Sequence, residues 1–467
     1  MLLDALRKKE EFMFPYVNTG TLFDLYTGKF RAGKDGKWPL DGGLSQCLGI
    51  TGRSQTYKSG IAGSLLANAL LVHPEAEALV YETEGTVGTA ERYDDFVPQD
   101  TPVSPRIVFR NSGEYTLTEF YEEFKHVVDA KLKNKKDYII DSPFVDRNGV
   151  PLKCLRPTFV LIDSYSRART SKGDEMYDSN TSIDDSSFNM YFAQEALQKT
   201  KIMNDLPIRA SKAGVYCILT AHVGNKIEMN AYSPTPKQLQ YMKQTDRLKN
   251  VGSSFEFLTT TMIQTLRATV LTNSSGGCAY PSARGTNNPM EVNQVDLMMV
   301  RCKNNASGVQ LPFIVSQWEG ILNSVTNFAF LANNKYKGLD VQGNNQAFTP
   351  MIYPEHQFRK FNLRDKSDKD YALARALELT AHLCFIQTLW NTARMPDFVN
   401  IPIEQFAEKL KNSTNCSIDR VLQSTSAWSS SKTAREQLTI MDVLALLEKE
   451  QPGNVSVDVP VNVKKSK

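Results

Sequence analysis

Eight consecutive residues follow the spacing of a phosphate-binding loop, G-x-x-x-x-G-K-[ST]: Gly52, Arg53, Ser54, Gln55, Thr56, Tyr57, Lys58 and Ser59. The backbone N–H groups of such a loop, and of a helix that starts near Gly60, can surround a phosphate group. Lys58 places a positive charge beside the β- and γ-phosphate oxygens, and the Ser59 hydroxyl is a ligand for Mg²⁺. The spacing therefore predicts a site for a nucleoside triphosphate with Mg²⁺. The alternative is a chance Lys-Ser pair.

One position departs from this pattern, because Tyr57 stands where a second glycine is usual. Glycine is common there because the backbone passes close to the phosphates. We expect the loop to accept Tyr57 only if its backbone is near-helical and its ring points away from the nucleotide.

Acidic residues follow two apolar runs that are typical of buried strands. Asp163 closes the apolar run 159–162, which is the place for an acid that holds Mg²⁺ directly or through water. Glu82 and Glu84 end an earlier run, where a carboxylate can orient a water in line with the γ-phosphate. We predict that Glu84 has this role because it lies beyond the buried run. Glu82 fits a solvated or a supporting acid equally well.

His222 ends another apolar run, 215–221, and stands directly before a long polar loop, 223–252. This position suits a sensor that reports the γ-phosphate to the loop. A structural histidine is the alternative.

Two polar loops, 166–171 and 223–252, carry basic residues that could contact a polyanion. In the second loop the basic residues alternate with Tyr232 and Tyr241, and cations with aromatic rings suit single-stranded nucleic acid. A solvated, charged loop is the alternative for each. The candidate contacts are Arg167, Arg169, Lys172, Lys226, Lys237, Lys243, Arg247 and Lys249.

Strands that alternate with helices, each strand apolar on both faces, predict an α/β fold with a mostly parallel sheet. Within it we expect a hairpin at 146–149, a loop over 165–186 and a helix over 188–204. We divide the chain by composition into an N-terminal segment (1–40, with a short helix at 2–14), a core (41–330), a linker (331–362), a small helical domain (363–453) and a basic tail (454–467). Residues 134–157 have the polar composition of an insertion.

The amino-acid composition limits the classes of function that are open to this chain. The chain has 467 residues, 41% of them hydrophobic, and a net charge of +3, so any nucleic-acid surface must be a local patch. No apolar run approaches a membrane span, and no secretory signal is evident. The seven cysteines are scattered without a C-x-x-C pair, which favours a reducing cytoplasm.

In the order of these parts the chain resembles the RecA family of recombinases, most closely the UvsX type of large phages, which also has an aromatic residue before the loop lysine. The resemblance covers about residues 20–325 and is weak beyond. The segments that carry it are 52–59, 81–84, 159–164, 220–222, 300–305 and 311–313.

The resemblance implies a RecA-like core that hydrolyses ATP at subunit interfaces of a helical filament on DNA. Glu84 would activate water, His222 would occupy a nucleotide-sensing position, and Lys303 would reach the ATP of a neighbouring subunit. Asn305 stands where bacterial members have a second lysine, so activation across the interface is expected to differ. The N-terminal segment would serve oligomerisation. The implied partners are single-stranded DNA, homologous duplex DNA, further copies of the chain, and a loader or single-strand-binding protein.

Three functions remain open at this point. The first is a DNA-dependent ATPase that forms filaments on single strands and catalyses homologous pairing and strand exchange in recombination and repair. The second is a ring-forming replicative helicase of the same ATPase superfamily. The third is an ATP-binding scaffold with no role on DNA.

Overall fold

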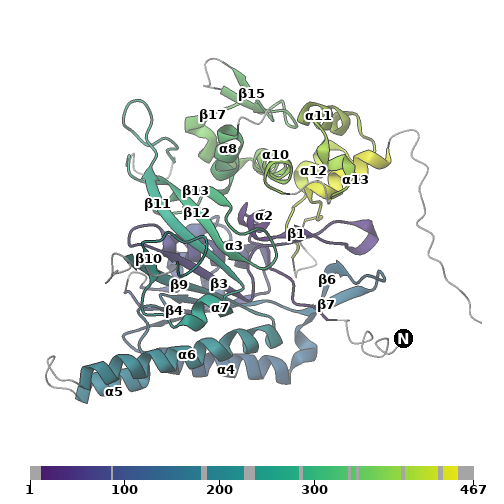
Figure 1. Ribbon diagram of the computed structural model, residues 1–467. Coiled ribbons are helices and arrows are strands. Elements are labelled where there is room, and N and C mark those ends of the chain that lie inside the picture. The colour runs from purple at the N-terminus through teal and green to yellow at the C-terminus, as the bar shows by residue number, and fades with distance from the viewer. Residues whose placement is uncertain are drawn as a thin grey trace, which may run out of the picture.

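The computed structural model describes residues 12–85, 88–179, 187–225, 237–282, 288–334, 338–342, 347–390, 395–429 and 435–450. A large sheet crosses the middle of the molecule, with helices on both sides (Figure 1). The predicted α/β class is therefore confirmed. The helix predicted at 2–14 lies mostly outside the described residues, as does the basic tail.

The central sheet is mostly parallel. Its strands run in the order β14 (Gly320–Ile321), β13 (Gln310–Ser316), β12 (Val292–Cys302), β11 (Thr261–Val270), β3 (Cys47–Gly52), β9 (Val215–Asn225), β8 (Thr158–Asp163), β4 (Glu77–Glu82) and β5 (Ile107–Asn111). The six strands from β11 to β5 are parallel, whereas β12, β13 and β14 continue the sheet antiparallel. A short strand, β10 (Asp246–Leu248), pairs with the end of β9.

Helices cover both faces because neighbouring residues of each strand point to opposite sides. Leu48 and Ile50 of β3 join a core cluster with α3 (Lys58–Val72). Cys47 of the same strand joins a second cluster with α4 (Leu117–Lys133) and α6 (Ser187–Ala213). The strands are therefore buried on both faces, as their unbroken apolar runs predict.

The hairpin forms as predicted, whereas two neighbouring segments differ from their predictions. The turn at 146–149 joins β6 (Ile139–Val145) to β7 (Pro151–Leu155), so the predicted hairpin is confirmed. The segment 165–186 is not wholly a loop, because α5 (Ser171–Ser179) forms within it. The following helix, α6, continues to Ala213 through Pro207, well past the predicted end at 204. A short helix, α7 (Ser253–Leu258), precedes β11.

The segment predicted as a linker contains regular structure. Strands β15 (Leu339–Gln342), β16 (Ala347–Pro350) and β17 (Phe358–Arg359) form a small sheet. Phe348 and Phe358 stack in it and contact Phe328 of α8 (Asn323–Asn333). This aromatic packing involves residues far apart in the chain, which the polar composition of 331–362 conceals.

Helices dominate the C-terminal part, as predicted: α9 (Leu363–Lys369), α10 (Tyr371–Leu389), α11 (Ile403–Asn412), α12 (Ile418–Gln423) and α13 (Ile440–Lys449). Leu373, Leu377 and Phe385 of α10 belong to the same core cluster as α3, so α10 packs on the sheet domain, whereas α11, α12 and α13 pack in a separate cluster with the other face of α10. The N-terminal part contributes α2 (Phe23–Thr27) and the paired strands β1 (Lys29–Phe30) and β2 (Leu40–Asp41). Within the described ranges, no helix is long and apolar enough to span a bilayer.

Candidate functional site

The sheet register brings the predicted residues to one edge. Gly52 is the Cα partner of His222 across β3 and β9, and Glu82 is the partner of Asp163 across β4 and β8. The carboxyl ends of these four parallel strands therefore meet, which is where open α/β sheets bind ligands.

The loop after β3 is closely packed at its start. A Cβ atom on Gly52 would lie 1.9 Å from the Thr265 hydroxyl of β11, so only glycine fits there. The Lys58 ammonium donates to the Arg53 carbonyl at 2.7 Å and is only 7% exposed. Burial lowers the pKa of Lys58, while the charges of Glu84 and Asp163 oppose this shift. The ammonium of Lys58 therefore lies near the carboxylates of Glu84 and Asp163 and is hydrogen-bonded to the backbone of its own loop.

Tyr57 has a different backbone from the one we expected. Its φ of 62° and ψ of 23° are left-handed rather than near-helical, which is uncommon for an aromatic residue. The ring is directed toward β12, where Asn293 donates to the Tyr57 hydroxyl at 2.7 Å. This hydrogen bond and packing against the core hold the residue in a conformation that glycine adopts without strain.

Asp163 is a buried carboxylate that could hold Mg²⁺ together with Ser59. It accepts a hydrogen bond from Thr220 on β9. Burial raises its pKa, whereas hydrogen bonds from Thr220 and Ser59 oppose the rise. A carboxylate beside a hydroxyl fits Mg²⁺, which is usually held by one or two carboxylates plus phosphate oxygens. In the described part of the chain, no group of three or more His, Cys, Asp or Glu side chains is arranged for a metal ion, so a full protein cage is absent there.

Glu84 and His222 are in direct contact. The His222 Nε2 atom lies 2.5 Å from Glu84 Oε1, and the Ser164 hydroxyl donates to the same oxygen at 3.2 Å. Burial raises the pKa of Glu84, but the hydrogen bonds and charge of His222, Ser164 and Arg167 outweigh it and lower the pKa. Glu84 is therefore an ionised acceptor, and its side chain is 24% exposed at the edge of the site.

Glu82 has a supporting position. Its two carboxylate oxygens accept the backbone N–H groups of Glu84 at 3.0 Å and Gly85 at 2.7 Å, and the residue is buried. These bonds hold the turn that presents Glu84. Of the two roles left open for Glu82, the geometry matches the supporting one.

The first basic segment lies beside this site. Ser166 accepts the His222 backbone N–H at 2.9 Å and donates its hydroxyl to the Lys249 carbonyl at 3.0 Å. Arg167 and Arg169 are exposed on either side of a buried Ala168. One serine therefore joins the two polar loops at the histidine.

The candidate contacts of the second loop are surface residues where the structure describes them. Lys237, Lys243, Arg247 and Lys249 are exposed, as is Lys172 just beyond the first loop, whereas Lys226 lies outside the described residues. Lys249 also donates its backbone N–H to the His222 carbonyl at 2.9 Å. The second loop therefore returns at its end to the sheet edge that carries His222.

Lys303 lies apart from the other predicted residues. It follows Cys302, whose strand partner is Thr261, and Thr261 in turn pairs with Leu48 near the start of β3. Lys303 is thus at the opposite edge of the sheet from the loop 52–59 of its own chain. Burial raises the pKa of Cys47 at that edge to about 12, and the charge of Lys303 opposes this rise.

Asn305 faces its own chain. Its amide donates to the Leu25 carbonyl of α2 at 3.1 Å, and its backbone N–H donates to the Cys302 thiol at 3.2 Å. The side chain is therefore used in packing the N-terminal segment.

Several residues that hold the predicted residues in place have no role predicted from the sequence. Three of them, Thr83, Ser164 and Thr220, lie within the segments of resemblance, which gave a detectable signal, whereas the others reach the site through contacts between distant residues. The residues are Thr83, Ser164, Ser166, Thr220, Asp246, Gln264 and Asn293.

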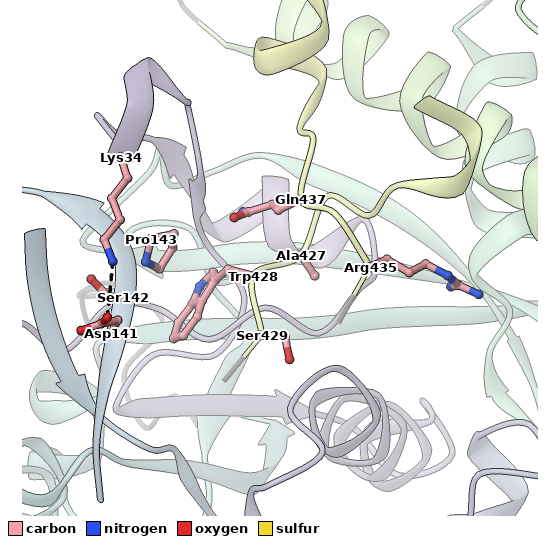
Figure 2. A pocket seen from close by; sticks show the side chains of 9 residues that line it. All are labelled: Lys34, Asp141, Ser142, Pro143, Ala427, Trp428, Ser429, Arg435 and Gln437. Atoms are coloured by element: carbon pink, nitrogen blue, oxygen red, sulfur yellow. Dashed lines mark ion pairs between the residues drawn. The ribbon is translucent and has the colours of Figure 1, made fainter. Parts of the chain in front are cut away.

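Two cavities of the structure are lined by other residues. One, of about 240 Å³, lies between the β6–β7 hairpin and the C-terminal segment around Trp428 (Figure 2). The other, of about 810 Å³, lies between the end of α3 and α10. Neither cavity is lined by a predicted site residue.

No protein-family model matches this chain, and no curated protein sequence matches it either.

Proposed function

We propose that the protein is a DNA-dependent ATPase with a RecA-like core, which forms filaments on single-stranded DNA and catalyses homologous pairing and strand exchange. One observation carries the proposal: Lys58, Asp163, Glu84 and His222 meet at one sheet edge, and Ser166 joins that edge to both basic segments.

The chemistry of the site is that of phosphoryl transfer to water. Catalysis of this reaction depends on positioning and on stabilising charge. Lys58 neutralises charge on the β- and γ-phosphates, and the ionised Glu84 accepts a hydrogen bond from the attacking water and orients it. Ser59 and Asp163 would hold Mg²⁺, which neutralises charge on the phosphate oxygens when bound.

His222 connects hydrolysis to the polar loops. Its ring contacts Glu84 Oε1, while its backbone carbonyl accepts from Lys249 and its backbone N–H donates to Ser166. A change in the hydrogen bonds of Glu84 therefore acts on one residue that both loops share. This arrangement supports a DNA affinity that depends on the bound nucleotide.

Assembly of several chains would complete the site. Lys303 is exposed at the far edge of the sheet. It can therefore reach only an ATP that is bound by a neighbouring subunit. A head-to-tail arrangement repeats such a contact along a helical filament.

The proposal is tested by ATP hydrolysis with and without single-stranded DNA. We expect DNA to stimulate hydrolysis and Lys58→Ala to reduce turnover by about 100-fold or more, because it removes a charge that stabilises the transition state. Unchanged turnover in this variant would remove the assigned site, and no response to DNA would favour a scaffold. Negative-stain images with a slowly hydrolysed ATP analogue then separate filaments from closed rings, which a helicase would form.

A further inference from the structure

Asp246 connects the phosphate-binding loop to the rigid sheet. Its Oδ1 atom accepts from the Arg53 guanidinium at 2.8 Å, and its Oδ2 atom accepts from the Gln264 amide at 2.7 Å. The Asp246 side chain is 3% exposed, whereas the Arg53 side chain is 47% exposed. A buried carboxylate with both oxygens bonded in this way has one stable position, which its two partners define.

The two partners belong to different parts of the fold. Gln264 belongs to β11, where it pairs with Thr51 of β3 in the middle of the sheet. Arg53 belongs to the loop, and its carbonyl accepts from both Lys58 and Thr56 at 2.7 Å. A phosphate that draws the Lys58 ammonium toward itself weakens the contact with Arg53. A change in the position of Arg53 then acts on Asp246 through the contact between the guanidinium and Oδ1.

A shift at Asp246 reaches the basic residues of the second loop. Asp246 opens β10, in which Arg247 pairs with Gly224 of β9. The Asp246 backbone N–H donates to the Lys243 carbonyl at 3.0 Å, which closes the turn before the strand. Exposed Lys243 and Arg247 therefore lie within three residues of the buried carboxylate on either side.

We infer that Asp246 is a positioning residue that couples the phosphate-binding loop to the basic segment 237–249, so that nucleotide binding changes the affinity of this segment for single-stranded DNA. The inference rests on the proposed function. It assigns the coupling to the Arg53–Asp246–Gln264 contacts in addition to His222.

The test measures the affinity of an oligothymidylate by fluorescence anisotropy, with and without a slowly hydrolysed ATP analogue. The ratio of the two affinities is the coupling, which typically lies at about 5- to 150-fold for linked sites. In Asp246→Asn we expect this ratio to fall toward one while the affinity for a fluorescent ATP analogue without DNA stays within about twofold. Asp246→Glu keeps the negative charge. We therefore expect its ratio to lie between those of Asp246→Asn and the wild type.

Asp41→Asn is the matched control because Asp41 is also buried and paired with an arginine, Arg31, but belongs to β2, which pairs with β1. It should leave the ratio unchanged. If Asp246→Asn does not fold, Gln264→Met removes the second anchor with little change of volume and should lower the ratio in the same direction.

A wild-type ratio in Asp246→Asn would overturn the inference, as would an equal loss of nucleotide affinity. If the DNA affinity of the wild-type protein is the same with and without the ATP analogue, the result would instead count against the proposed function.

Discussion

Two glutamates that stand two positions apart have different tasks. Glu82 accepts two backbone N–H groups and is buried, whereas Glu84 contacts His222 at the open edge of the site. Both are carboxylates at the end of β4. Replacing each one in turn therefore distinguishes an effect on the rate of hydrolysis from an effect on stability.

We expect Glu84→Gln to slow ATP hydrolysis by about 10²- to 10⁴-fold, because an amide is a poor acceptor for the proton of the attacking water. Nucleotide affinity should stay within a few-fold, which titration with a fluorescent ATP analogue would show. Equal losses of affinity and turnover would make Glu84 a structural residue.

Glu82→Gln is the matched control. An amide cannot accept both backbone N–H groups, so we expect a loss of about 1–3 kcal/mol in the free energy of unfolding, measured by urea denaturation. A fully stable Glu82→Gln protein would contradict the supporting role.

At the scale of elements, α4 is attached to the sheet by a buried lysine. Lys131 is 3% exposed, donates to the Arg156 carbonyl and to the Thr158 hydroxyl of β8, and lies under the turn before β9. Burial lowers its pKa to about 7. The helix also begins with a capping box of Thr116 and Glu119, so its direction over the sheet is set at both ends.

The lowered pKa of Lys131 predicts a dependence of stability on pH. Between pH about 7 and about 10.4 the unfolded chain retains a proton on this lysine that the folded chain has lost. The free energy of unfolding should therefore rise with pH across this window, by at most about 1.4 kcal/mol per unit. Urea denaturation at a series of pH values measures the slope. Lys131→Met should remove this contribution, and an identical slope in the variant would refute the assignment.

The second basic segment is expected to contact the phosphate backbone. Replacing Lys243 and Lys249 together by Ala should weaken single-stranded DNA binding and lower the slope of log affinity against log salt by roughly 1.4. Lys409 and Lys411 on α11 form the control pair, since they lie in the C-terminal helices. An unaltered salt slope in the first double variant would remove this segment from the contact surface.

At the scale of the whole molecule, Trp428 joins parts that composition separates. Its indole N–H donates to the Tyr16 carbonyl at 3.2 Å, and its ring contacts Phe144 of the hairpin and His73 at the end of α3. The C-terminal segment, the insertion and the N-terminal segment therefore share one anchor (Figure 2).

We expect Trp428→Ala to lower the free energy of unfolding by about 3–5 kcal/mol, because it leaves a cavity among these three parts. Trp318→Ala is the control, since Trp318 is 60% exposed and should change stability by no more than about 0.5 kcal/mol. Urea denaturation of the two variants gives the comparison. Equal stabilities would mean that the three parts are held together elsewhere.

Local patterns were sufficient for much of the fold and of the site. The loop spacing at 52–59 and the apolar runs before Glu82, Asp163 and His222 predicted which residues end parallel strands. Because the carboxyl ends of parallel strands share one edge, this order also predicted that the residues would meet.

Contacts between distant residues were required for the rest. Tyr57 is left-handed because Asn293 and the core hold it, and residues 331–362 form strands because their phenylalanines pack on α8. Asp246, in a polar loop, is buried only because Arg53 and Gln264 converge on it from elsewhere. Strand register and the burial of a residue depend on contacts between distant parts of the chain. They therefore cannot be predicted from a short stretch of sequence.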